Sequence, residues 1–139
     1  MSLEPLLAAP LVVQIHAFGA MAGLILGTIQ IVAPKGTLPH KTLGFVWIVV
    51  MAAVGISSAF IQHPVEPGDP FWKRFSAIHI FTLMTAYSLV AGGWLLMRGG
   101  PAMRLHSRPF IGLFIGGLLI AGALAFLPGR IMHQIAFGE

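Results

Sequence analysis

Hydrophobic residues fill four long blocks of the chain, and the charged residues gather in the short stretches outside them. The blocks contain no Lys, Arg, Asp or Glu and cover residues 10–33, 42–62, 76–97 and 109–127. Each block has roughly the 20 residues that a helix needs to cross ~30 Å of hydrocarbon. The pattern therefore predicts an all-α integral membrane protein, an antiparallel four-helix bundle that forms a single transmembrane domain over residues 1–139.

Composition supports a protein that lies in a lipid bilayer. Of the 139 residues, 57% are hydrophobic and only 9% are charged, whereas about a quarter of an ordinary soluble domain is charged. This balance excludes a cytosolic enzyme, a disordered tail and a secreted disulfide scaffold, and the absence of cysteine excludes a thiolate metal site. The net charge of +4 does not indicate nucleic acid as a partner, because the basic residues flank apolar spans and therefore act as topology signals.

The distribution of basic residues predicts the orientation of the spans. The first and third connections hold five basic residues and no acidic one: Lys35, Lys41, Arg98, Arg104 and Arg108. The other side holds three basic and four acidic residues. Because basic loops stay in the cytoplasm, both termini are predicted to lie outside, with Trp47, Trp94 and Trp72 near the membrane interfaces.

Local signals place several helix starts. Thr37 is suited to cap a helix that begins at Leu38, and Asp69 followed by proline predicts the start of the third helix. Ser107 is suited to begin the fourth, which leaves His106 just outside it. The run 131–137 is expected to be a short interfacial segment folded against the outer face.

Histidines are the candidate functional residues. His16 and His79 lie near the outer ends of the first and third spans, and His40 and His106 lie at the inner starts of the second and fourth. In an up-down bundle, helices one and three face each other across the diagonal, and so do helices two and four. Because a haem iron needs an imidazole on each face, the four histidines are candidate ligands of one or two haem b groups.

Glycines beside these histidines predict room for a porphyrin. Gly19 follows His16 by one turn in a ridge of small residues, and Gly44 follows His40 by one turn. Arg130 is a candidate partner of a haem propionate, and His133 is a candidate for a third outer metal ligand. A structural role is the alternative for every one of these histidines, and His63 is expected to be solvated in its loop.

Three segments resemble a widespread bacterial family of four-helix membrane proteins classed only as a domain of unknown function. They are QIVAPKGTLPHKTLGFVW (30–47), FSAIHIFTL (75–83) and FLPGRIMHQIAFG (126–138). The resemblance implies a multi-pass protein of the bacterial inner membrane.

A more distant similarity is to the ascorbate-reducible transmembrane b-type cytochromes, which pair haem-binding histidines of helices one and three and of helices two and four. It implies that His16 pairs with His79 and that His40 pairs with His106. The chain departs from those cytochromes because it has four helices where they have six, and because His40 and His106 lie nearer the aqueous edge.

Three functions follow as hypotheses. The first is a b-type haem protein that transfers electrons, as a possible cytochrome b-type oxidoreductase for a quinol or a small anionic reductant. The second is a membrane transporter or sensor with a divalent-metal or proton site made by His16, His79 and His133, although no Asp or Glu lies within a span. The third is a non-catalytic subunit, as a homo-oligomer or within a larger membrane complex.

Overall fold

Four long apolar helices make up most of the protein. The computed structural model describes residues 3–62, 66–74 and 79–138. The candidate spans are α2 (Leu11–Val32), α3 (Leu38–Phe60), α4 (His79–Arg98) and a fourth span over Gly100–Leu124. The fourth span consists of α5 (Gly100–Met103), α6 (Ser107–Leu113), the π-helical segment η2 (Phe114–Ile120) and α7 (Ala121–Leu124).

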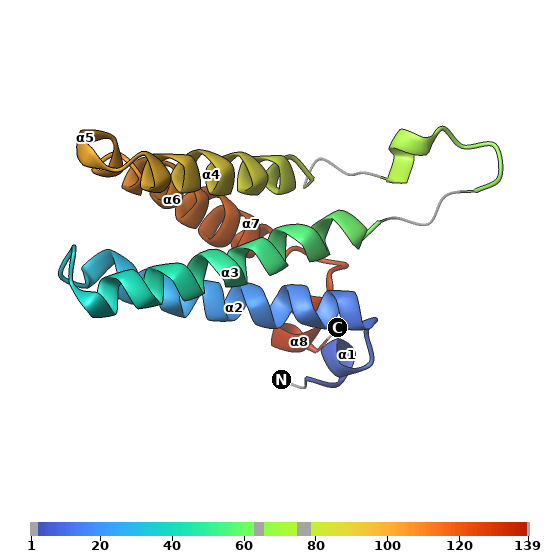
Figure 1. Ribbon diagram of the computed structural model, residues 1–139. Helices are drawn as coiled ribbons and strands as arrows, with labels where there is room; N and C mark the ends of the chain where they lie inside the picture. Colours follow the sequence, from blue (N-terminus) through green and yellow to red (C-terminus); the bar gives the residue numbers. More distant parts are fainter. Residues whose placement is uncertain (1–2, 63–65, 75–78, 139) are drawn as a thin grey trace.

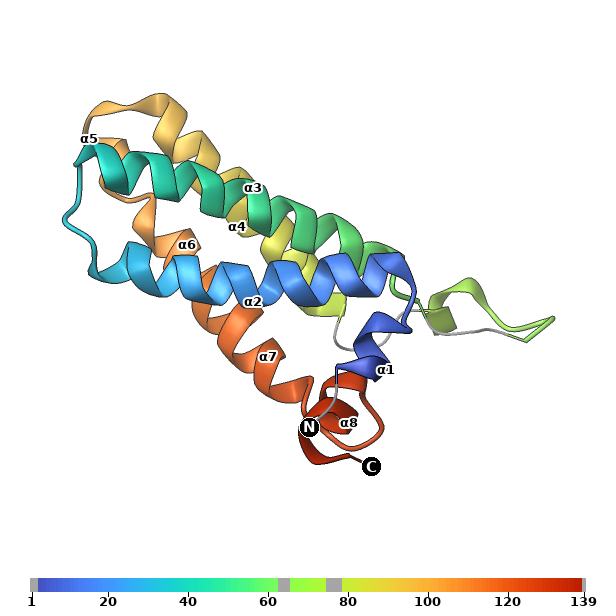
Figure 2. The ribbon, with the colours of Figure 1, turned by 90° about the horizontal axis from the view of Figure 1, so that it is seen from below.

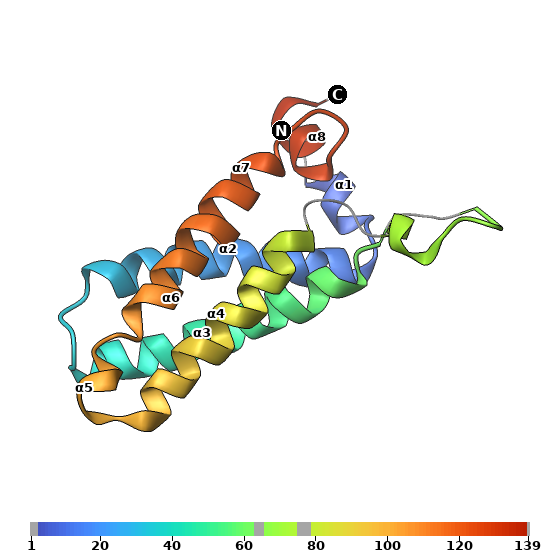
Figure 3. The same cartoon turned by 90° about the horizontal axis from the view of Figure 1, so that it is seen from above.

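The four spans form an antiparallel bundle, as the sequence predicts (Figure 1). Each span packs on the next along the chain, and η2 also contacts α2, which closes the ring. Figure 3 shows that the fourth span runs obliquely to α2 and α3. This arrangement places α2 and α4 on opposite sides of α3.

Both termini lie at one end of the bundle (Figure 2). There the short helices α1 (Glu4–Leu7) and α8 (Ile131–Phe137) pack on each other, with Leu6 and Ile135 buried. The turn between α2 and α3 and the turn around α5 lie at the opposite end.

The buried core is small, and glycines bring the helices together around it. It consists of six residues from α3, α6 and η2: Trp47, Met51, Val54, Leu113, Phe114 and Leu118. A Cβ atom at Gly23 would lie 2.9 Å from the sulfur of Met51, so the glycine leaves room on α2 for this side chain of α3. Large apolar side chains elsewhere on the spans are exposed, as expected where lipid is the solvent.

Trp47 does not lie in an interfacial aromatic belt, and that prediction is wrong. Its side chain is only 4% exposed, and its indole Nε1 donates to the Gly23 carbonyl at 2.9 Å. The polar N–H of a buried indole needs a partner, and the neighbouring backbone of α2 provides one.

The predicted start of α3 is confirmed, because the Thr37 hydroxyl accepts a hydrogen bond from the His40 backbone N–H at 3.3 Å. The start of α6 at Ser107 is also confirmed, and the C-terminal segment forms a short helix, α8.

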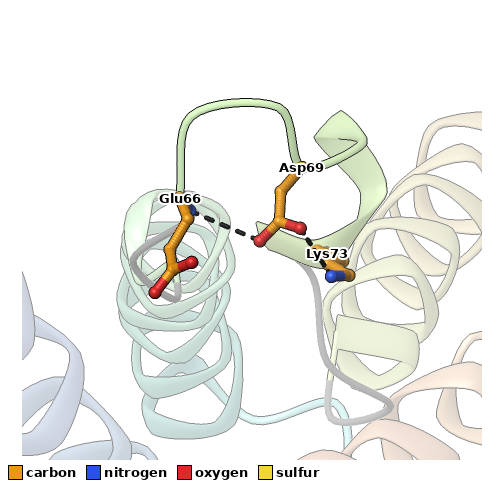
Figure 4. Close-up of polar contacts among 3 residues, drawn as sticks. All are labelled: Glu66, Asp69 and Lys73. Carbon is orange, nitrogen blue, oxygen red and sulfur yellow. Dashed lines mark hydrogen bonds and ion pairs between the residues drawn. The ribbon is translucent and has the colours of Figure 1, made fainter.

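The capping role predicted for Asp69 is wrong. A 3₁₀ turn, η1 (Phe71–Arg74), follows Pro70, and the Asp69 carboxylate accepts from the Glu66 N–H at 3.3 Å and from Lys73 at 2.5 Å (Figure 4). His63 and the predicted start of the third span at residues 76–78 lie outside the described residues.

Candidate functional site

His16 connects α2 to the backbone of α3. Its Nδ1 lies 3.1 Å from the Val54 carbonyl oxygen and 3.3 Å from the Ser57 hydroxyl, which itself donates to the same carbonyl at 3.0 Å. Because a carbonyl oxygen only accepts, Nδ1 carries the proton and donates it. The imidazole therefore completes a polar cluster between two helices.

The space beside His16 is filled by the protein itself. A Cβ atom at Gly19 would lie 2.9 Å from Cγ2 of Val54. The glycine thus lets α3 approach α2 closely, and the volume that the sequence assigned to a porphyrin holds the Val54 side chain.

His79 also binds α3, at the end of that helix. Its Nε2 lies 3.0 Å from the carbonyl oxygen of Ile61, the C-cap residue of α3. Carbonyls at a helix C-terminus lack partners within the helix, so a side-chain donor there is stabilising. His16 and His79 therefore both bind backbone groups of α3, although they lie on helices that face each other across the bundle.

His40 lies in the first turn of α3 beside Gln30 of α2. The Gln30 amide Nε2 donates to the His40 carbonyl at 2.8 Å, and the same nitrogen would be 2.7 Å from a Cβ at Gly44. Gly44 thus makes room for a glutamine side chain. Gln30 Oε1 and His40 Nδ1 are buried atoms that have no hydrogen-bond partner in the described part of the chain.

His106 lies close enough to His40 to interact with it electrostatically. Its Nδ1 donates to the carbonyl of Met103 in the preceding turn, and its ring meets Phe110 edge-on at a centroid distance of 6.1 Å. The inner pair is therefore brought to one end of the bundle, but each histidine makes its own local contacts.

His133 and Arg130 belong to the turn that leads into α8. His133 Nδ1 donates to the Phe126 carbonyl at 2.9 Å, and its ring lies 4.8 Å from that of Phe137. Arg130 is the N-cap residue of α8. The imidazole of His133 thus binds the turn, and Arg130 takes part through its backbone, which donates to the Leu127 carbonyl at 3.3 Å and accepts from the Gln134 N–H at 3.1 Å.

The described residues contain no group of three or more His, Asp or Glu side chains that could hold a metal ion. Four histidines bind backbone carbonyls through one ring nitrogen: His16, His79, His106 and His133. In each case the imidazole makes a hydrogen bond that joins two helices or closes a turn.

Sequence reasoning missed several polar side chains of the spans. Ser58 and Thr82 share a hydrogen bond of 2.9 Å between α3 and α4, and Thr85 and Ser88 are buried on α4. Tyr87 is the reverse case, because it lies near the middle of α4 and is 72% exposed. Small hydroxyl residues at helical spacing and a single mid-span tyrosine were the signals available in the sequence.

No protein-family model and no solved structure matches the chain. Among curated proteins, it is similar to the potassium-transporting ATPase potassium-binding subunit of Salmonella arizonae, with 29% identity over 106 residues. The same subunit of Escherichia coli O45:K1 and of Escherichia coli O127:H6 is 28% identical over 106 residues. Each match covers 70% of this chain but only 19% of the relative.

These findings correct the interpretation as a haem protein. The similar proteins are potassium-binding subunits of a transporting ATPase, not cytochromes b. The function in electron transport and the similarity to ascorbate-reducible cytochromes are therefore wrong, and the contacts of His16 and His79 with α3 agree with this correction. The chain is a multi-pass membrane protein with four candidate spans, similar over most of its length to part of a transporter subunit.

Proposed function

We propose that this chain is a non-catalytic subunit of a larger transporter-type complex in the bacterial inner membrane. The observation that carries the proposal is the similarity of 106 residues to a potassium-binding subunit. Because the match covers only 19% of that subunit, this chain would supply one four-helix unit of a larger assembly. The third hypothesis from the sequence thereby becomes the main one.

The contacts of the bundle support a packing role. The candidate spans carry no Asp or Glu in their apolar blocks, so no carboxylate is available within them to neutralise a cation in hydrocarbon. The histidines with carbonyl partners stabilise the bundle. Cation ligands would then come from a partner subunit, and this chain would hold the partner's helices in place.

The proposed orientation has both termini on the outer side. The structure supports it because the two turns that carry the basic residues lie together at the end of the bundle opposite the termini. A C-terminal reporter that is active only in the cytoplasm should stay inactive, whereas the same reporter inserted after Gly36 should be active. The opposite result at both positions would invert the topology.

The functional experiment deletes the chain from its host and measures uptake of rubidium as a tracer for potassium. We expect uptake at low external potassium to fall, and expression of the chain in trans to restore it. The tagged chain should also copurify in mild detergent with a transporter at a fixed ratio. Unchanged uptake in the deletion strain, with the chain migrating alone, would contradict the proposal.

A further inference from the structure

Tyr87 places a hydroxyl group on the outer surface of the bundle at the depth of the hydrocarbon. It is 72% exposed and lies near the middle of α4. At 1.5 Å per residue, its Cα lies roughly 12 Å from the start of that helix, too far for the ring to carry its hydroxyl to the headgroups. Hydrocarbon offers no hydrogen-bond partner, so an unpaired polar group there is costly.

The phenol differs from the other hydroxyls of the spans. Thr28 donates to the Leu24 carbonyl at 2.8 Å, and Thr85 donates to the Phe81 carbonyl at 2.8 Å. Such short side chains reach the carbonyl one turn back in their own helix. The Tyr87 hydroxyl stands at the far end of a rigid ring and cannot do this, and it has no partner in the part of the chain that the structure describes.

The surface around Tyr87 is suited to contact with another helix. The space beside Gly92 of α4 is filled by the protein itself, because a Cβ there would lie 2.4 Å from the Phe110 ring. The next residue, Gly93, has nothing within 4 Å of a Cβ built on it. Gly93 flanks a stripe of exposed side chains at alternating spacings of three and four residues, the pattern of helices that pack in parallel: Ile80, Leu83, Tyr87, Val90, Trp94 and Met97.

We propose that this face of α4 is the interface with a second copy of the chain, related by a twofold axis along the membrane normal. Such an axis places both Tyr87 side chains at the same depth and facing each other. A phenol both donates and accepts, so the hydroxyl of one copy donates a hydrogen bond to the hydroxyl oxygen of the other. Gly93 and the neighbouring Ala86 let the backbones approach closely.

Charge does not oppose this arrangement. The face carries no ionised side chain between Ile80 and Met97. Arg98 lies beside the inner end of the face, where its guanidinium stacks over the ring of Trp94 in the same chain at 4.3 Å. The inference goes beyond the proposed transporter role, since it concerns self-association and holds whether or not the complex moves potassium.

Cysteine cross-linking in membranes tests the proposal directly, because the chain has no cysteine of its own. Val90→Cys lies on the face, and Ile56→Cys on α3 is a matched control; the two native side chains are 73% and 64% exposed. With copper phenanthroline as the oxidant, Val90→Cys should give a disulfide-linked dimer, and Ile56→Cys should stay monomeric. Equal cross-linking of both variants, or a monomer at position 90, would overturn the proposal.

A second measurement removes only the hydroxyl. In lipid vesicles of phosphatidylethanolamine and phosphatidylglycerol, energy transfer between labelled copies should show that Tyr87→Phe raises the dimer dissociation constant by about three- to tenfold. Gly93→Ile should weaken the dimer further by keeping the backbones apart. Full energy transfer in both variants would contradict a second copy as the occupant of this face. So would cross-links from Val90→Cys in membranes that join the chain to a different protein and not to itself. These readouts are independent of rubidium uptake.

Discussion

Both the glycine ridge of α2 and the outer face of α4 contain glycine, but only the ridge packs against other spans of the same chain. On α2, side chains of other spans fill the space beside each glycine of the ridge: Gly19, Gly23 and Gly27. On α4, nothing lies within 4 Å of a Cβ built at Gly93, and Tyr87, six residues earlier, has no hydrogen-bond partner among the described residues. A small residue in a membrane helix therefore marks a close approach, but it does not tell whether the approaching group belongs to the same chain.

The comparison also explains why the haem interpretation failed. The ridge beside His16 looked like space for a cofactor because its neighbours in the sequence are small. In the structure, Val54 enters that space, and the imidazole binds the carbonyl of the same residue.

The largest effect is expected at the centre of the ridge. In Gly27→Leu, the new side chain would begin 2.6 Å from the Phe114 ring and 2.8 Å from Trp47 Nε1, where nothing can move aside cheaply. Overpacking of this kind should lower the free energy of unfolding by about 3 kcal/mol. Titration of the detergent-solubilised monomer with SDS measures the change.

Gly93→Leu is the matched control, because it makes the same chemical change at an open position. The free energy of unfolding of its monomer should stay within about 0.5 kcal/mol of the unmodified protein. If both glycine variants lose stability equally, the contrast between the filled ridge and the open face is wrong.

A smaller effect is expected for the hydrogen bond that fastens α3 to this ridge. Trp47→Phe removes the donor to the Gly23 carbonyl and part of a buried ring, so it should destabilise the monomer by about 2 kcal/mol. The exposed Trp94 offers the control Trp94→Phe, which keeps an aromatic ring under Arg98. Equal losses of stability for the two variants would show that the buried bond is unimportant.

His16→Ala should cost about 1 kcal/mol, in the range of hydrogen bonds between membrane helices. The loss is modest because Ser57 still donates to the Val54 carbonyl. A chelator should leave the unfolding curve of the unmodified protein unchanged, since His16 acts as a hydrogen-bond donor here. A chelator effect that disappears in His16→Ala would instead identify a metal ligand.

The sequence predicted the four spans well because the length of an apolar, charge-free block is enough to define a membrane helix. The cap at Thr37 was also predictable, since it depends on residues three apart. The partners of His16 and Trp47 were not, because these helices are apolar on all sides and give no amphipathic signal of which face meets a neighbour. The Asp69 cap failed because the Glu66 N–H and Lys73 bind its carboxylate, and the residues after Pro70 form a 3₁₀ turn.

The smallest effect on monomer stability is expected at the open face itself. Ser58→Ala breaks the bond to Thr82 between α3 and α4 and should cost about 0.6 kcal/mol, the average for such bonds in membranes. Tyr87→Phe also removes one mid-span hydroxyl, but that hydroxyl contacts nothing described in its own chain. Its monomer should therefore unfold like the unmodified protein, while its dimer weakens. A loss of monomer stability in Tyr87→Phe equal to that in Ser58→Ala would place the phenol's partner inside the bundle and remove the reason for a second copy.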